Sequence, residues 1–163
     1  MSETQSDPDL DGSPPPSGET VRLSALVRRR IAPNGGPFTA TGTCSYLVGD
    51  EAVAIVDPGP ADEGHIAALV AACAGAPVTA ILVTHTHRDH SPGARLLQAH
   101  TGAPILGCGP HRAARHRLPG ELPLLDASAD RAHRPDREMQ DGEVIAAASR
   151  SARVMPSSSM SSL

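Results

Sequence analysis

The feature that most constrains this chain is an apolar, strand-like run that ends in a dense cluster of histidine and aspartate. Residues 78–84 read VTAILVT, an almost continuous apolar and β-branched pattern that is typical of a strand covered on both faces. Residues 84–93 then read THTHRDHSPG. Four potential metal ligands lie within six residues: His85, His87, Asp89 and His90. The sequence therefore predicts a buried strand whose end carries chemistry.

The spacing of these side chains favours metal binding. His85 and His87 are two residues apart, so on an extended backbone they point to the same side. The loop toward the next helix is expected to bring Asp89 and His90 to a second position nearby. Imidazole and carboxylate groups together are ligands for Zn²⁺, with Fe or Mn as substitutes. The alternative is a solvated loop whose histidines only cap the next helix, and the position of the cluster at a strand end favours the metal site.

Hydrophobic patterns elsewhere predict an α/β layered fold. Alternating apolar residues indicate half-buried strands, and an apolar stripe after the N-capping residue Asp62 indicates an amphipathic helix. The expected elements, in order, are strands over residues 21–27, 43–49 and 52–57, a helix from Asp62 to Gly75, the strand over 78–84, a helix over 94–102 and a strand over 104–107.

Composition excludes several classes of protein. The formal charge of −4 argues against a protein that wraps a polyanion. The only aromatic residues are Phe38 and Tyr46, so no aromatic platform for stacking bases is expected, which also argues against a nucleic-acid partner. The acidic, polar first residues do not resemble a secretory signal, and no apolar run reaches the ~18 residues of a membrane span. The three cysteines form no CxxC pair, so a cytoplasmic protein away from membranes is predicted.

The chain is expected to divide into three parts. Residues 1–20 are polar and rich in proline, which predicts a disordered leader. Residues 21–145 carry the alternating and amphipathic patterns and are expected to form the folded domain. Residues 146–163 show no apolar period and end in a serine-rich stretch, which predicts a disordered tail.

The HxHxDH segment resembles the signature of the metallo-β-lactamase fold superfamily. GTCSYLVG (residues 42–49) and AVAIVDPG (52–59) resemble the paired strands upstream of that signature, and TGAPILG (101–107) resembles the strand after its helix. Within the superfamily, the likeness is greatest to small hydrolases that include endoribonuclease-like, β-lactamase-like proteins. The resemblance covers residues 21–145 and implies the N-terminal half of an αββα sandwich.

The resemblance implies a role for each residue of the cluster. His85 and His87 resemble ligands of a first zinc site, and Asp89 and His90 resemble ligands of a second, with Asp89 also the candidate catalytic residue. Asp57 matches an aspartate that supports the site from the neighbouring strand end and would fix a histidine tautomer. A turn or helix-entry role in Asp-Pro-Gly is the alternative for Asp57.

His111 is a possible extra ligand, because it follows the short strand whose end is expected near the site. The remaining histidines are expected to face solvent: His65, His100, His116 and His133.

The resemblance implies a hydrolase that uses one or two zinc ions to activate water for attack on a carbonyl or phosphoryl centre. The substrate is then a small-molecule ester, thioester or lactam, or a phosphodiester. The family's remaining ligands lie on later strands, and residues 141–145 (DGEVI) resemble the start of one of them. Residues 146–163 contain no histidine and no aspartate. The alternative is therefore a catalytically inactive, truncated or frameshifted fragment with one sheet face exposed.

Overall fold

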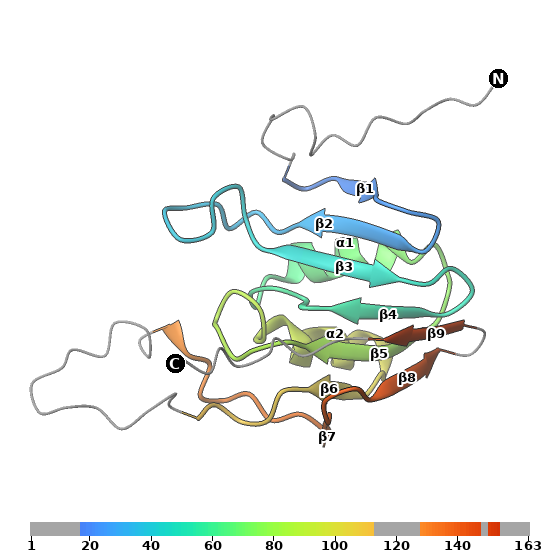
Figure 1. Ribbon diagram of the computed structural model, residues 1–163. Helices are drawn as coiled ribbons and strands as arrows, with labels where there is room; N and C mark the ends of the chain where they lie inside the picture. Colours follow the sequence, from blue (N-terminus) through green and yellow to red (C-terminus); the bar gives the residue numbers. More distant parts are fainter. Residues whose placement is uncertain (1–16, 113–127, 148–149, 154–163) are drawn as a thin grey trace, which may run out of the picture.

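The computed structural model describes residues 17–112, 128–147 and 150–153 (Figure 1). Most of the predicted leader, His116 and much of the predicted tail lie outside these residues. The elements in chain order are β1 (Thr20–Arg22), β2 (Val27–Ile31), β3 (Cys44–Val48), β4 (Val53–Val56), α1 (Glu63–Ala72), β5 (Val78–Val83), α2 (Gly93–Thr101), β6 (Ile105–Gly107), β7 (Arg137–Glu138), β8 (Val144–Ala147) and β9 (Arg150–Arg153).

Strands β1 to β7 form one sheet in sequence order. Neighbouring strands from β1 to β4 are antiparallel, whereas β4, β5, β6 and β7 run parallel to one another. The connection from β4 to β5 passes through α1 and that from β5 to β6 through α2, as the predicted strand–helix alternation requires. The carboxyl ends of the parallel strands β4, β5 and β6 therefore lie at the same edge of the sheet (Figure 1).

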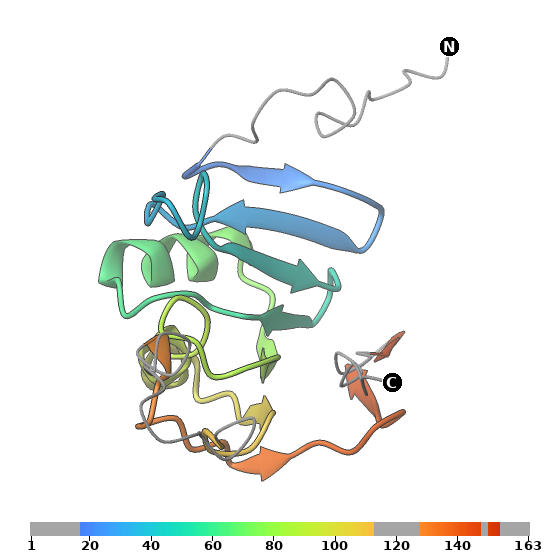
Figure 2. The ribbon, with the colours of Figure 1, turned by 60° about the vertical axis from the view of Figure 1, so that its left-hand side comes forward.

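The two helices cover one face of the sheet, and the β8–β9 hairpin lies on the opposite side (Figure 2). Facing the helices, Ile55, Ile81 and Ile105 stand side by side on β4, β5 and β6. They pack with Leu69 of α1 and Leu97 of α2 in the main hydrophobic core, and all five side chains are at most 1% exposed. The period-2 alternation of the strands thus directs large apolar side chains toward the amphipathic helices.

The opposite face of the sheet carries a smaller cluster. Ala54, Ala80, Leu82 and Leu106 are each 6% exposed or less, and Ile145 of β8 packs against them. We expected this face to be exposed in a half-domain, and for these four side chains that expectation is wrong. Val56 and Met139 also pack against this cluster, and the short alanine side chains leave little apolar surface to cover.

The predicted strand over residues 21–27 is wrong, because a turn divides it into β1 and β2. The hydroxyl of Ser24 accepts hydrogen bonds from the backbone N–H groups of Leu26 (3.3 Å) and Val27 (3.1 Å), which stabilises the turn. The alternation of apolar residues in this segment continues through the turn and therefore conceals it.

Most other predicted elements are present, with small differences at their ends. Asp62 caps α1 as expected, since its carboxylate accepts the backbone N–H of His65 at 2.7 Å. The helix ends at Ala72 and not at Gly75, because Ala74 and Gly75 adopt left-handed conformations. Strand β9 lies within the segment predicted to be a disordered tail. Within the described part of the chain, no helix is both long and apolar enough to cross a membrane.

Candidate metal centre

The candidate site is formed where β4 and β5 end. These neighbouring parallel strands run directly into Asp57 and into Thr84 and His85, so the three residues meet at one edge of the sheet. Asp57 is 7% exposed and has a left-handed backbone, with φ at +49°. One member of the cluster is therefore a buried carboxylate, whereas a solvated loop would expose it.

The Asp57 carboxylate links the strand end to the HxHxDH segment. Its Oδ1 accepts the backbone N–H of Thr84 at 2.8 Å, and its Oδ2 accepts the Thr84 hydroxyl at 2.7 Å. The same Oδ2 lies 3.1 Å from Nδ1 of His90. A carboxylate at Nδ1 can fix the tautomer of an imidazole, so this contact is where the supporting role predicted for Asp57 would act.

The three histidines of the segment lie together. The ring centroid of His85 is 4.6 Å from that of His87 and 4.2 Å from that of His90. His85 and His87 thus lie on the same side of the chain, as their two-residue spacing predicts. Thr84 gives its hydroxyl proton to Asp57, so it accepts the Nδ1–H of His85 at 2.9 Å, and the lone pair of His85 is left on Nε2.

Asp89 completes the cluster from the other side of His90. Its Oδ2 lies 3.2 Å from Nε2 of His90 and accepts the hydroxyl of Thr43 at 3.0 Å. His90 therefore has a carboxylate at each ring nitrogen. The structure brings all four residues of the segment together, as expected from the sequence.

Three residues have donor atoms close enough to hold one metal ion. One ligand atom each from Asp57, His85 and His90 lies within 4.8 Å of the others. Imidazole nitrogen and carboxylate oxygen are the donors that Zn²⁺ takes in proteins, so the residues fit this ion. His87 and Asp89 border this set through His85 and His90, and His111 is outside it.

The two central histidines differ in their affinity for protons. Burial, and then the neighbouring His90, lower the pKa of His85 below its usual value. Burial also disfavours the charged form of His90, but its hydrogen bond to Asp57 and the charges of Asp57 and Asp89 outweigh burial and raise its pKa. Of these two rings, His90 therefore binds a second proton more readily than His85 does.

Residues 128–130 hold the HxHxDH segment from outside. The backbone N–H of Arg88 donates to the carbonyl of Ser128 at 2.8 Å, and the Ser91 hydroxyl donates to Oδ2 of Asp130 at 2.7 Å. The sequence gives no signal for these contacts, because residues 128–130 lie in a stretch without apolar period. Thr43 was missed because it contacts Asp89, 46 residues away, and no local pattern links the two.

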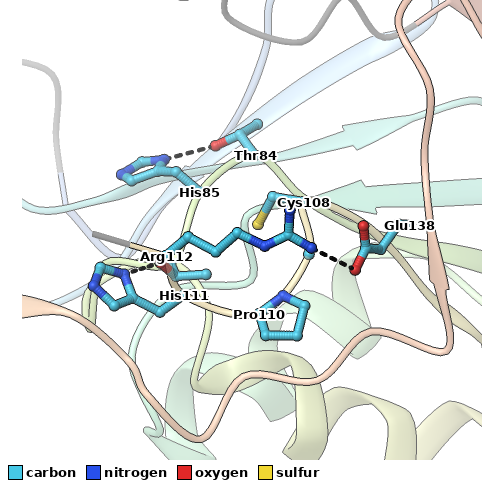
Figure 3. Close-up of a pocket in the computed structure, with 9 residues that line it drawn as sticks. Thr84, His85, Cys108, Pro110, His111, Arg112 and Glu138 are labelled. Carbon is cyan, nitrogen blue, oxygen red and sulfur yellow. Dashed lines mark hydrogen bonds and ion pairs between the residues drawn. The ribbon is translucent and has the colours of Figure 1, made fainter. Parts of the chain in front are cut away.

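A cavity of about 260 Å³ opens beside His85 (Figure 3). Its wall includes Cys108, whose thiol pKa is raised to about 11, chiefly by burial. Arg112 and Glu138 form an ion pair at 3.9 Å across it. His111 also lines the cavity, with its Nδ1 2.9 Å from the Thr86 hydroxyl. The cavity borders the candidate metal centre through His85.

Two histidines expected to face solvent are buried. His65 is 3% exposed and its Nε2 lies 3.1 Å from the hydroxyl of Ser45. His133 is 4% exposed and its Nε2 lies 3.1 Å from the carbonyl of Cys108. For His65 a signal exists in the sequence, since it precedes the core residue Leu69 by one helical turn. His100 is half exposed, as expected, beside Glu63.

The family model of the metallo-beta-lactamase superfamily matches residues 39–160, about three quarters of the chain. The chain belongs to the metallo-beta-lactamase superfamily. The match continues past residue 145, where the resemblance was expected to end. A solved beta-lactamase domain protein from Burkholderia ambifaria shares the superfamily fold, with a TM-score of 0.61, 23% identity and coverage of 90% of this chain and 54% of that one.

Two curated relatives have names that state an activity. An atrochrysone carboxyl ACP thioesterase of Aspergillus chevalieri is 33% identical over 129 residues, which cover 74% of this chain and 42% of the relative. A hydroxyacylglutathione hydrolase of Pseudomonas putida is 42% identical over 73 residues, which cover 45% of this chain and 26% of the relative. The chain thus spans less than half of either relative.

Proposed function

We propose that this chain carries the metal centre of a metal-dependent hydrolase, with His85, His87, Asp89 and His90 as the ligands of one or two zinc ions. The observation that carries the proposal is the gathering of three imidazoles and two carboxylates at the end of β5, beside a cavity. Fe or Mn are alternative metals, since they take the same donors.

Contacts around the ligands support this assignment. Nδ1 of His85 is engaged by Thr84, which leaves its Nε2 for a metal. Nδ1 of His90 is engaged by Asp57, and its Nε2 faces Oδ2 of Asp89 at 3.2 Å, so a metal between them would take both atoms in place of this contact. When bound, zinc would lower the pKa of a water molecule and polarise a substrate carbonyl. Thr43 donates to Oδ2 of Asp89, a contact that would hold this proposed catalytic carboxylate in position.

We propose a small-molecule thioester as the substrate class, ahead of an ester, a lactam or a phosphodiester. The two relatives support this choice by their names, a thioesterase and a hydrolase of hydroxyacylglutathione. We also propose that the protein acts in the cytoplasm. Cys44, Cys73 and Cys108 are free thiols in the structure, which supports a reducing compartment.

The proposal is tested by zinc titration of the purified chain against a competing chelator, followed by a thioester hydrolysis assay. We expect zinc binding that His85→Ala weakens and that His100→Ala leaves unchanged, since His100 lies on α2 beside Glu63. Hydrolysis that depends on zinc and on His85 supports the hydrolase. Zinc binding without hydrolysis supports the inactive fragment, and no zinc binding contradicts both the metal centre and the hydrolase.

A further inference from the structure

A short chain of buried polar groups runs from α1 to the candidate metal centre. Nε2 of His65 lies 3.1 Å from the hydroxyl of Ser45, and that hydroxyl donates to the backbone carbonyl of Asp57 at 2.6 Å. Ser45 is fully buried and His65 is 3% exposed. Neither residue belongs to the HxHxDH segment, and neither is a donor in the candidate metal group.

The direction of the hydrogen bonds fixes the tautomer of His65. The Asp57 carbonyl can only accept, so the single hydroxyl proton of Ser45 is committed to it. Ser45 must then accept from His65, and the proton of the neutral imidazole lies on Nε2. Burial, and then the charge of Arg30, lower the pKa of His65, which agrees with a neutral ring. Among the described residues, Nδ1 of His65 has no hydrogen-bond partner, so no acceptor holds the ring proton at that nitrogen.

Asp57, at the end of this series of hydrogen bonds, has an uncommon backbone conformation. Asp57 has φ at +49°, a left-handed conformation that residues other than glycine seldom adopt. Its N–H donates to the carbonyl of Leu82 at 2.8 Å, and its carbonyl accepts from Ser45. The His65 ring also packs closely below the turn, since a Cβ on Gly59 would lie 3.3 Å from it. The backbone N–H and the backbone carbonyl of Asp57 are thus both held by hydrogen bonds.

We propose that Ser45 and His65 are positioning residues, which hold Asp57 in its left-handed conformation and thereby aim its carboxylate at His90 and Thr84. The inference rests on the proposed function, because it concerns the same metal centre. A shift of the Asp57 backbone would move the carboxylate that holds Nδ1 of His90 and would weaken metal binding without removing a ligand.

The first test uses the full chain without metal. Two-bond ¹H–¹⁵N spectra are expected to show His65 neutral with its proton on Nε2. The Thr84 amide, which donates to Asp57, should exchange about tenfold faster in Ser45→Ala than in Ile66→Val, a buried control next to His65. A proton on Nδ1 of His65, or equal Thr84 exchange in the two variants, would overturn the inference.

The second test is zinc affinity. Ser45→Ala and His65→Leu should each weaken binding about tenfold. His65→Gln should keep most of the affinity, because its amide can still donate to Ser45, and Ile66→Val should match the unmodified chain. Equal affinity in all four variants would overturn the inference. If the unmodified chain binds no zinc, the proposed function fails, and the tautomer and the Thr84 exchange still decide the inference.

Discussion

The helix-covered face of the sheet and its carboxyl-end edge are built from adjoining residues of the same strands, yet different forces hold them together. On β5, the core residues Ile81 and Val83 are followed at once by Thr84 and His85. The face consists of apolar side chains that need only be covered, whereas the edge consists of polar groups, each matched to a partner. Stability and metal binding are therefore expected to respond to different substitutions.

Leu97→Ala should destabilise the helix-covered face of the sheet and give the largest effect of the changes described below. Leu97 is fully buried between α2 and the sheet, so its truncation should lower the free energy of unfolding by about 3 kcal/mol, as a cavity in a packed core does. Urea denaturation measures this loss. The zinc affinity of the folded fraction should stay within about twofold. A loss of stability below about 1 kcal/mol would show that the helices do not close this core.

His87→Ala should instead lower the zinc affinity of the carboxyl-end edge. His87 is exposed and its ring contacts that of His85, so its removal should change the unfolding free energy of the metal-free chain by less than about 0.5 kcal/mol. Zinc affinity should fall about 100-fold, which corresponds to roughly 2.7 kcal/mol. Competition with a chromophoric chelator measures it. An unchanged affinity would remove His87 from the ligand set.

Acid should weaken zinc binding at the carboxyl-end edge. The raised pKa of His90 keeps it protonated at a higher pH than an ordinary histidine, so protons compete with zinc as the pH falls through that value. His85, with its lowered pKa, stays available at lower pH. Zinc affinity should therefore fall by at least about tenfold between pH 7 and pH 5. An affinity that is flat over this range would mean that the imidazoles are not the ligands.

Asp57→Asn should give the smallest effect of the four changes, a fall in the pKa of His90. Asparagine tolerates a left-handed backbone, so the turn should persist. Removal of the carboxylate at Nδ1 should lower the pKa of His90 relative to the unmodified chain, because burial is then opposed by Asp89 alone. NMR titration of the His90 ring measures the shift. A pKa that does not fall would show that Asp57 does not hold the second proton on this ring.

Local patterns predict the helix-covered face well and the edge only in part. The apolar run of β5 and the two-residue spacing of His85 and His87 each carry their consequence within a few residues. The partnership of Thr43 with Asp89 joins residues 46 positions apart, and no local period marks it. The turn at Ser24 was hidden for a different, local reason, since a side-chain hydrogen bond outweighs an apolar alternation that continues past it.

The resemblance supplied what local patterns could not. It placed Asp57 beside the HxHxDH segment, and the contact between its carboxylate and His90 agrees with that placement. It did not point to His65 or Ser45, because their proposed positioning roles depend on hydrogen-bond directions inside this fold. Buried polar contacts of this kind are set by three-dimensional packing, and residue type alone does not reveal them.

The edge of the sheet is expected to bind metal through the imidazoles of the HxHxDH segment. Calorimetric titration of the metal-free, 163-residue chain with zinc at pH 7.5, beside His85→Ala, tests it most directly. The account predicts binding with a dissociation constant on the order of tens of micromolar, as expected for an incomplete ligand set, and a loss of about 100-fold in His85→Ala. Equal affinity in the two proteins, or no heat of binding at millimolar zinc, would contradict it.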